Sequence, residues 1–464
     1  MTHVMKSLKR FYKIYILLID LALILLAYVI TFYVRYKGLP TYNFTPFLRS
    51  IPYILIASVI YIDLFKVLSF FRKNVYDVLK SIGLTVALLG ITTIAVAYML
   101  QGFSFPRLIL LITPVVQFIL LGVFNIFLLN LKNRISKEKK IMVVCEDRYR
   151  DRGITDKIRV FTKNDKIEKL MVLDLSQQKV VMRRLGVMDE VYISANIPAE
   201  LKAEIIKRCM GGKQVIYVVP HLFEISLINA KVMQLDDTPA FLVDTLGLRA
   251  EQAFVKRLFD IVASLTGIII LSPFMLIIAL LIRLTSSGPA LFKQERMTKG
   301  NKTFYVIKFR TMRQDAEEVT GPVLSEEKDP RVTPIGRLLR RTRVDEIPQL
   351  FNVLKGDMSL VGPRPERPFF VEQFINKLPE YEHRFAVKAG ITGYAQIYGN
   401  YSTPPEDKLR YDLMYIRNYS LLLDIKLIVN TLRVIFTPGS TYRKHNEASE
   451  ENDSRNRNVK KGIV

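Results

Sequence analysis

The chain has 464 residues, of which 50% are hydrophobic, and its lysines and arginines outnumber its acids to give a net charge of +24. Such a chain is not typical of one soluble domain; it is typical of a membrane protein that faces anionic lipid or phosphate-bearing ligands. Two cysteines, Cys145 and Cys209, exclude a disulfide framework, and the basic residues are spread along the chain rather than gathered on a nucleic-acid-binding module.

Four apolar segments dominate the first 135 residues. Each approaches or exceeds the roughly 20 residues that a helix needs to cross a bilayer. Asp20 and Asp63 are the acids within them; intramembrane acids can mark a transport pathway, pair with lysine or face another helix. Few other polar residues are present, so a transport pathway is not evident. We predict a four-helix transmembrane bundle in residues 1–135, with spans at 14–34, 51–71, 81–100 and 108–131.

Basic residues orient this bundle. Lysine and arginine precede the first segment, separate the second from the third and follow the fourth, whereas the loop between the third and the fourth contains only Arg107. Because positive charge collects on the cytoplasmic side, we expect both ends of the bundle in the cytoplasm. No small-residue cleavage site follows the first apolar run, so a signal peptide is not expected.

Residues 136–245 change in character. Short apolar runs at 141–145, 170–175, 191–195 and 215–220 alternate with segments such as 198–210, which has a helical pattern. This alternation predicts a Rossmann-like α/β domain with a small parallel sheet. Dinucleotide binding would need a glycine-rich turn after the first strand, and the turn EDRYRDRG contains one glycine. We therefore interpret the domain as a structural or regulatory module.

The apolar stretch within residues 258–284 resembles a fifth span. Basic residues flank both of its ends, and Ser272 and Pro273 lie near its middle. Proline kinks a helix because it removes a hydrogen bond and clashes with the preceding turn. Since both flanks should be cytoplasmic, we predict a re-entrant membrane helix that breaks at Ser272 and Pro273. The alternative is an ordinary kinked span, which would place the following residues outside the cytoplasm.

Residues 291–312 predict two strands around the turn KGNK. Lys308 and Arg310 alternate with Phe309, so the two basic side chains should share one face of the second strand. A solvated strand face is the alternative interpretation.

A run of arginines then precedes two adjacent carboxylates, Asp345 and Glu346. Pro348 indicates that a helix begins just after the pair. Guanidinium groups such as those of Arg337 and Arg340 suit phosphate oxygens. A carboxylate beside a phosphate can bind a divalent cation or attack phosphorus. Taken alone, such a pair before a proline is more typical of a helix cap.

The longer stretch DEIPQLFNVLKGDMSLVGPRP, at 345–365, closely resembles the catalytic core of the bacterial sugar transferases, which are monotopic polyprenyl-phosphate phosphoglycosyl transferases. Further resemblances occur in order at KRLFDI, LSPF, KFRTM and RYDLMYIRNYSLLLDIK, so that the similarity covers about residues 250–437. The whole chain then reads as membrane α plus α/β: a bundle, a Rossmann-like domain and a catalytic domain over 250–440 that contains the re-entrant helix. Residues 441–464 are polar and charged, and we predict a disordered tail.

This resemblance implies roles for individual residues. Asp345 would be the nucleophile and Glu346 a ligand of Mg²⁺. Arg364 and the adjoining Pro365 would lie at the nucleotide end of the donor. The remaining candidates for substrate binding are Lys308, Arg310, Arg337, Arg340 and Asp412; for Asp412, an acid on a helix surface is the alternative.

The implied reaction moves a sugar 1-phosphate, from UDP-galactose or UDP-glucose, to undecaprenyl phosphate through a covalent aspartyl intermediate, releasing UMP. It would be the first membrane step of exopolysaccharide, capsule or O-antigen synthesis, on the cytoplasmic face of a bacterial inner membrane. Membrane lipid and a second copy of the chain are the other expected partners, and nucleic acid is not expected. Two alternatives remain: a glycosyltransferase that releases UDP, and a non-catalytic scaffold of polysaccharide assembly.

Overall fold

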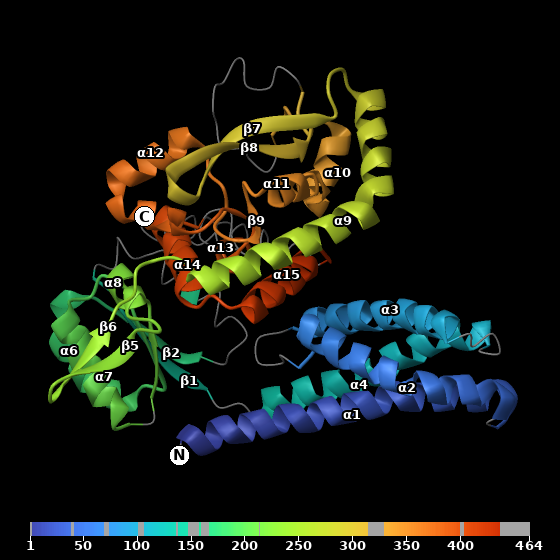
Figure 1. The fold of residues 1–464 in the computed structure, drawn as a ribbon. Helices are drawn as coiled ribbons and strands as arrows, with labels where there is room; N and C mark the ends of the chain where they lie inside the picture. The colour runs from blue at the N-terminus through green and yellow to red at the C-terminus, as the bar shows by residue number, and fades with distance from the viewer. Residues whose placement is uncertain are drawn as a thin grey trace, which may run out of the picture. The chain divides into compact units, whose positions relative to one another are not determined.

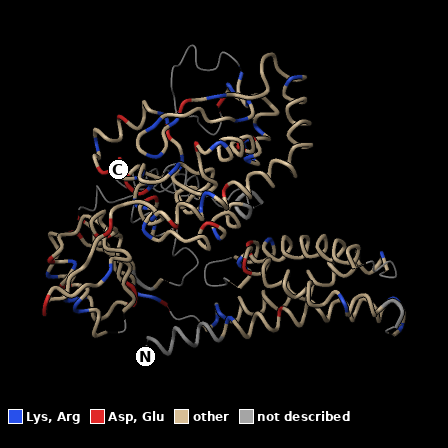
Figure 2. Tube along the Cα trace, viewed as in Figure 1, with Lys and Arg blue, Asp and Glu red and all other residues tan. Residues whose placement is uncertain are grey.

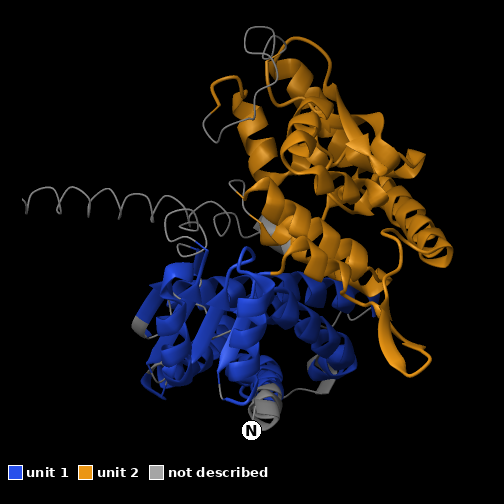
Figure 3. Ribbon diagram, turned by 90° about the vertical axis from the view of Figure 1, so that its left-hand side faces the viewer, with its two compact units in different colours: residues 1–219 blue, residues 220–464 orange. Residues whose placement is uncertain are grey.

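The computed structural model describes residues 2–38, 41–68, 74–100, 106–135, 138–146, 157–158, 167–212, 214–313, 329–399 and 403–436. The chain divides into two compact units, Met1–Val219 and Pro220–Val464 (Figure 3). The predicted disordered tail lies outside the described residues.

The first unit begins with four helices that are long and apolar enough to cross a membrane, in agreement with the four predicted segments (Figure 1). They are α1 (Thr2–Tyr36), α2 (Thr41–Leu64), α3 (Val75–Met99) and α4 (Arg107–Ile135). The second helix differs from the prediction, because its apolar part is Phe44–Leu64, whereas the predicted span is 51–71, of which 69–71 lie outside the described residues. The chain leaves the helix at a turn where Lys66 has a φ of 51°, so the polar Asp63 and Lys66 mark the end of the span rather than its interior.

Polar contacts inside the bundle connect the helices. Asn125 Nδ2 on α4 donates to Asp20 Oδ1 on α1 at 2.9 Å, and Tyr28 on α1 shares a 2.9 Å hydrogen bond with Thr93 on α3. Asp20 therefore faces another helix, one of the two structural alternatives that the sequence leaves open. Charged residues are sparse along these helices (Figure 2), as contact with lipid requires.

The rest of the first unit is a parallel four-stranded sheet in the order β2-β1-β3-β4. Each of the four predicted apolar runs contributes a strand, and the predicted helix at 198–210 is α7 (Ala199–Met210). The strands are β1 (Lys139–Val144), β2 (Ile167–Leu173), β3 (Glu190–Ile193) and β4 (Val215–Val218). The shorter helices are η2 (Leu175–Gln177), α6 (Gln178–Arg184) and η3 (Leu185–Val187).

The second unit begins within the segment that the sequence assigns to the middle domain. It contains α8 (Leu222–Ser226) and the antiparallel hairpin β5 (Lys231–Leu235) and β6 (Thr238–Leu242). Ile225 of α8 is fully buried in a core cluster that includes Tyr381 and Leu413. Helix α8 thus packs within the C-terminal unit.

Helix α9 (Ala250–Thr285) is long and apolar enough to cross a membrane, and it turns sharply partway along its course (Figure 1). It contains Pro273, and the hydroxyl of Ser272 donates to the Ile269 carbonyl at 2.9 Å. Both halves of α9 pack on the second unit: Arg257 donates to the carbonyls of Val353 and Leu354 at 2.6 and 2.8 Å, and Ile282 lies in a cluster with Phe309. The element is a continuous kinked helix whose two halves contact the same compact unit.

The remaining elements of the second unit surround the two carboxylates. The predicted pair of strands is confirmed as the antiparallel hairpin β7 (Leu291–Thr298) and β8 (Lys302–Phe309), connected by η4 (Lys299–Asn301), where Gly300 has a φ of 69°. Next come α10 (Pro334–Thr342), η5 (Val344–Glu346), α11 (Gln349–Lys355) and β9 (Ser359–Val361). Strand β9 pairs in parallel with β10 (Gly390–Thr392). The other helices are α12 (Pro368–Lys377), η6 (Pro379–Ala386), α13 (Tyr394–Tyr398), α14 (Pro405–Arg417) and α15 (Leu421–Phe436).

Candidate active site

Asp345 and Glu346 lie in η5, a single tight turn between α10 and α11. Arg343 ends α10 in the left-handed conformation, with a φ of 55°, and this reverses the chain so that η5 packs against β8. Helix α11 has only seven residues. The charge balance at the two carboxylates therefore depends on side chains rather than on the dipole of a long helix.

Two cations from different elements contact Glu346. Arg364 Nη2 donates to Glu346 Oε1 at 3.1 Å, and Lys308 Nζ of β8 lies 3.6 Å from the same oxygen. The structure thus brings together four of the predicted site residues, because Asp345 immediately precedes Glu346. The second carboxylate of the pair is fixed by ion pairs, and the first lies beside it.

The two carboxylates differ in their proton affinity. Burial, together with the neighbouring charge of Glu346, raises the pKa of Asp345 to about 6, although Lys308, Arg340 and Arg364 oppose this rise. Burial also acts to raise the pKa of Glu346, but Arg364, Lys308 and Arg343 outweigh it and lower that pKa to about 2. Near neutral pH, Glu346 is a permanent anion and Asp345 is the more basic carboxylate of the two.

Arg364 is carried by a loop that packs directly on another backbone segment. The Gly362 amide donates to the Thr392 carbonyl at 2.8 Å, and the Gly390 amide donates to the Pro363 carbonyl at 2.8 Å. A Cβ on Gly362 would lie 2.4 Å from the carbonyl oxygen of Lys388, so this approach requires glycine. Pro365 is buried. The loop is therefore a fixed platform for the Arg364 guanidinium.

The other predicted arginines lie around this centre. Arg340 Nε donates to Thr311 Oγ1 at 2.8 Å, and its charge acts on Asp345. Arg310 is 6% exposed; it donates to the Ser286 carbonyl at 2.9 Å, and its Nε and Nη1 have no hydrogen-bond partner in the described part of the chain. Arg337 is exposed on α10. Of these three residues, Arg340 has the clearest influence on the carboxylates.

Asp412 is buried beside an arginine rather than exposed on the surface of α14. It is 1% exposed and lies 2.8 Å from Arg384, a buried residue that the sequence did not single out. Arg384 in turn donates to the backbone carbonyl of Arg364 at 3.0 Å. The sequence signal that could have identified Arg384 is its position as a basic residue among apolar ones, because Tyr381, Phe385 and Val387 all lie in the core.

The carboxylates suit one divalent cation of the magnesium type. Among the described residues, no cluster of three or more histidine, cysteine or acidic side chains could hold a metal. Mg²⁺ commonly takes only one or two carboxylates and completes its shell with substrate phosphates and water. A pair of adjacent carboxylates such as Asp345 and Glu346 fits that pattern.

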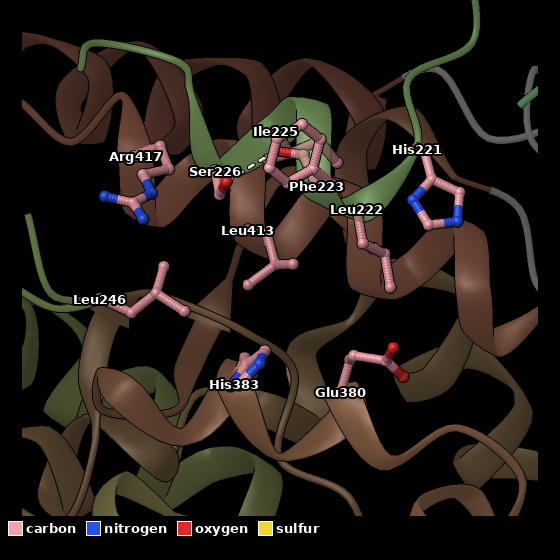
Figure 4. A pocket seen from close by; sticks show the side chains of 10 residues that line it. All are labelled: His221, Leu222, Phe223, Ile225, Ser226, Leu246, Glu380, His383, Leu413 and Arg417. Atoms are coloured by element: carbon pink, nitrogen blue, oxygen red, sulfur yellow. Dashed lines mark hydrogen bonds between the residues drawn. The ribbon is translucent and has the colours of Figure 1, made fainter. Parts of the chain in front are cut away.

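Two cavities of the second unit lie apart from the carboxylates. One, of about 290 Å³, is lined by residues of α8, η6 and α14, with His221, Glu380 and His383 around its apolar wall (Figure 4). The other, of about 590 Å³, is lined by residues that include Tyr394, Tyr398 and Tyr411. Neither of these two cavities is lined by Asp345 or Glu346.

Residues 251–438 match the family model described as bacterial sugar transferase. An N-acetylgalactosaminephosphotransferase of Aeromonas hydrophila, which is named for undecaprenyl phosphate, is 46% identical over 188 residues, 40% of this chain and 44% of the relative. The exopolysaccharide production protein PSS of Rhizobium leguminosarum bv. phaseoli is 43% identical over 199 residues, covering 40% of this chain and 98% of that protein.

A UDP-glucose:undecaprenyl-phosphate glucose-1-phosphate transferase of Xanthomonas campestris pv. campestris is 33% identical over 287 residues, 60% of this chain and 55% of that protein. The chain thus spans about half of the Aeromonas and Xanthomonas relatives and nearly all of the Rhizobium one. The residues that match the family model include Asp345 and Glu346.

Proposed function

Because the chain belongs to the bacterial sugar transferase family, we propose that it transfers a sugar 1-phosphate from a UDP-sugar to undecaprenyl phosphate and releases UMP. From the sequence we propose galactose or glucose as the sugar. The name of the Xanthomonas relative supports glucose, and the name of the Aeromonas relative adds N-acetylgalactosamine as a third candidate. The product would begin a membrane-bound polysaccharide.

The arrangement of the two carboxylates carries this proposal. Glu346 is held by Arg364 and Lys308, whereas Asp345 is the more basic group of the pair. A nucleophile must present an electron pair to phosphorus, and a neighbouring cluster of cations must offset the charge of the phosphates. The site supplies both from side chains that converge on one turn.

In the first step an oxygen of Asp345 attacks the β-phosphorus of the UDP-sugar. A bond forms between that oxygen and phosphorus, and the bond from phosphorus to the bridging oxygen breaks, so that UMP leaves with the electron pair. In the second step a phosphate oxygen of undecaprenyl phosphate attacks the same phosphorus, which frees the Asp345 carboxylate and yields a lipid diphosphosugar. Covalent catalysis divides the transfer into two easier steps.

The remaining residues orient phosphates. Arg364 and Lys308 are placed to offset the charge of the donor diphosphate, and Arg340, Arg337 and Arg310 supply further guanidinium groups for substrate phosphates. When bound, Mg²⁺ held by Glu346 and the phosphate oxygens would neutralise the charge that develops on the leaving group. Phosphoryl transfer depends mainly on such positioning and charge stabilisation.

We also propose that α9 is re-entrant and that it seats the site at the cytoplasmic face of a bacterial inner membrane. The packing of both halves of α9 on one unit supports this, as do the basic residues at both flanks. Thirteen large apolar side chains between Phe254 and Leu284 are exposed, which suits contact with acyl chains. We further propose that residues 136–245 form a Rossmann-like structural or regulatory module. On the family resemblance, we also propose that the protein forms a homodimer.

The decisive test is the identity of the nucleotide that is released. Purified protein in detergent would be given Mg²⁺, undecaprenyl phosphate and a panel of UDP-sugars, and the nucleotide products would be separated by chromatography. UMP supports the proposal, and the best donor identifies the sugar. UDP would indicate a glycosyltransferase, and no nucleotide from any donor would favour the scaffold.

A further inference from the structure

We infer that the buried pair Arg384 and Asp412 is a positioning device that holds the loop of Arg364 in register with Glu346. The catalytic consequence of this inference rests on the proposed function, and the positioning itself does not. Arg384 and Asp412 contact neither carboxylate of the centre; they act through the backbone that carries Arg364.

The loop at 362–366 needs external partners. Pro363 and Pro365 have no amide hydrogen, so the loop cannot build a local ladder of hydrogen bonds. Instead, its carbonyls accept from other segments: Pro363 from the Gly390 amide at 2.8 Å, and Pro365 from Arg296 Nη1 at 3.3 Å. The Glu366 carbonyl accepts from the Met297 amide at 3.0 Å.

The carbonyl of Arg364 itself accepts from Arg384 Nη2 at 3.0 Å. Arg384 therefore contacts the loop at the residue whose guanidinium holds Glu346. A shift of this peptide unit would move the side chain that it carries, since the neighbouring prolines restrict the backbone on both sides. The hydrogen bond from Arg384 thus fixes the position of the Arg364 backbone, from which the guanidinium extends to Glu346.

Asp412 compensates the buried charge of Arg384 and orients its guanidinium. Both side chains are 2% exposed, and the carboxylate lies 2.8 Å from Arg384 Nη2. Arg384 Nη1 donates to the hydroxyl of Tyr381, and the guanidinium also lies 4.8 Å from the centre of that ring. The planar fork of arginine can serve the carboxylate, the hydroxyl and the carbonyl together, which a single ammonium group cannot do in the same geometry.

A purely structural role is the alternative, since the pair also connects α14 to η6. The two roles separate when both charges are removed at once. Replacing a buried ion pair by apolar residues of similar volume often leaves stability unchanged, whereas removing one partner strands a buried charge. The double variant Arg384→Met/Asp412→Leu therefore keeps the packing and removes the hydrogen bond to Arg364.

A matched control lies on the same helix. Arg410 Nη1 donates to Asp407 Oδ1 at 2.6 Å within α14, and their side chains are 18% and 25% exposed. The variant Arg410→Met/Asp407→Leu removes an ion pair of the same type. It leaves all four carbonyl contacts of the loop in place.

The experiment combines two readouts on the full-length protein in detergent. Hydrogen–deuterium exchange of peptides covering 362–366 measures the positioning of the loop without any reaction. Steady-state UMP release, with kcat and KM for the donor taken separately, measures the consequence for catalysis. Thermal unfolding establishes that each variant is folded.

We expect the Arg384→Met/Asp412→Leu variant to unfold near the wild-type temperature, to exchange faster at 362–366 and to lose about 100-fold in kcat, as a small misplacement of a catalytic group can cost. The control should match the wild type in both readouts. Unchanged exchange at 362–366 in a folded double variant would overturn the inference, and so would a wild-type kcat. If the wild type releases no UMP, the proposed function fails while the exchange measurement still decides the positioning.

Discussion

Arg364 donates a hydrogen bond to Glu346 at 3.1 Å, and this contact makes the two adjacent carboxylates differ in their pKa. The ion pair keeps Glu346 ionised, and the resulting fixed charge is one cause of the raised pKa of Asp345. One carboxylate is thereby suited to hold cations and the other to react with phosphorus.

Replacing the proposed nucleophile should abolish turnover. In Asp345→Asn the side chain keeps its size but no longer presents a carboxylate, so we expect UMP release to fall by roughly 10⁴-fold or more with the fold retained. The measurement is UMP release beside thermal unfolding. Asp357→Asn is the control, because the Asp357 carboxylate lies 3.1 Å from exposed Lys355 and should leave the rate unchanged. Near-normal UMP release by folded Asp345→Asn would refute the nucleophile assignment.

The acidic limb of the pH profile should report the ionisation of Asp345. Burial and the charge of Glu346 raise the pKa of Asp345 to about 6, so protonation removes the nucleophile as the pH falls through that value. We expect single-turnover UMP release to decrease about tenfold per pH unit below the limb and to level off above it. A rate that stays constant well below pH 6 would argue that Asp345 does not titrate in this range.

Removing the charge of Glu346 should move that limb in a defined direction. Since the negative charge of Glu346 contributes to the raised pKa of Asp345, Glu346→Gln should lower this pKa and shift the limb to more acidic pH. The same pH series on the variant measures the shift. A limb that moves to higher pH would contradict the coupling between the two side chains.

The response to magnesium should also weaken in Glu346→Gln. A neutral amide is a poorer ligand for a hard cation than a carboxylate, and we expect the Mg²⁺ concentration for half-maximal UMP release to rise by roughly tenfold or more. Glu372→Gln, on an exposed position of α12, is the matched control. An unchanged magnesium dependence in the Glu346 variant would remove this residue from the proposed metal site.

The sequence predicted the elements whose signals are local. The apolar helices, the parallel strands and the hairpin around Gly300 all follow from hydrophobic period, length and turn chemistry. The end of the second span was wrong because Lys66 marks an exit turn, and hydropathy alone extended the segment beyond it.

The connections within the site depend on packing between distant segments. Lys308 meets Glu346 across 38 positions, and Arg384 meets Asp412 across 28. No local period specifies such pairs. Asp412 was a candidate for substrate binding with an acid on a helix surface as the alternative, whereas its observed partner is a buried arginine. Sequence similarity indicates which residues belong to a site more readily than it indicates which of them contact one another.

The path of α9 through the membrane can be tested by labelling its two ends from each side. If α9 is re-entrant, both of its ends lie on the cytoplasmic side, and a spanning helix would place them on opposite sides. Glu251 and Ser287 are exposed near the two ends, and the native Cys145 and Cys209 are buried and can be replaced by serine to remove background labelling. Glu251→Cys and Ser287→Cys would each be treated with a membrane-impermeant maleimide in intact cells and in inverted vesicles. We expect both positions to react in inverted vesicles and neither in intact cells. Labelling of one position from each side would show instead that α9 crosses the bilayer and would separate the site from cytoplasmic UDP-sugars.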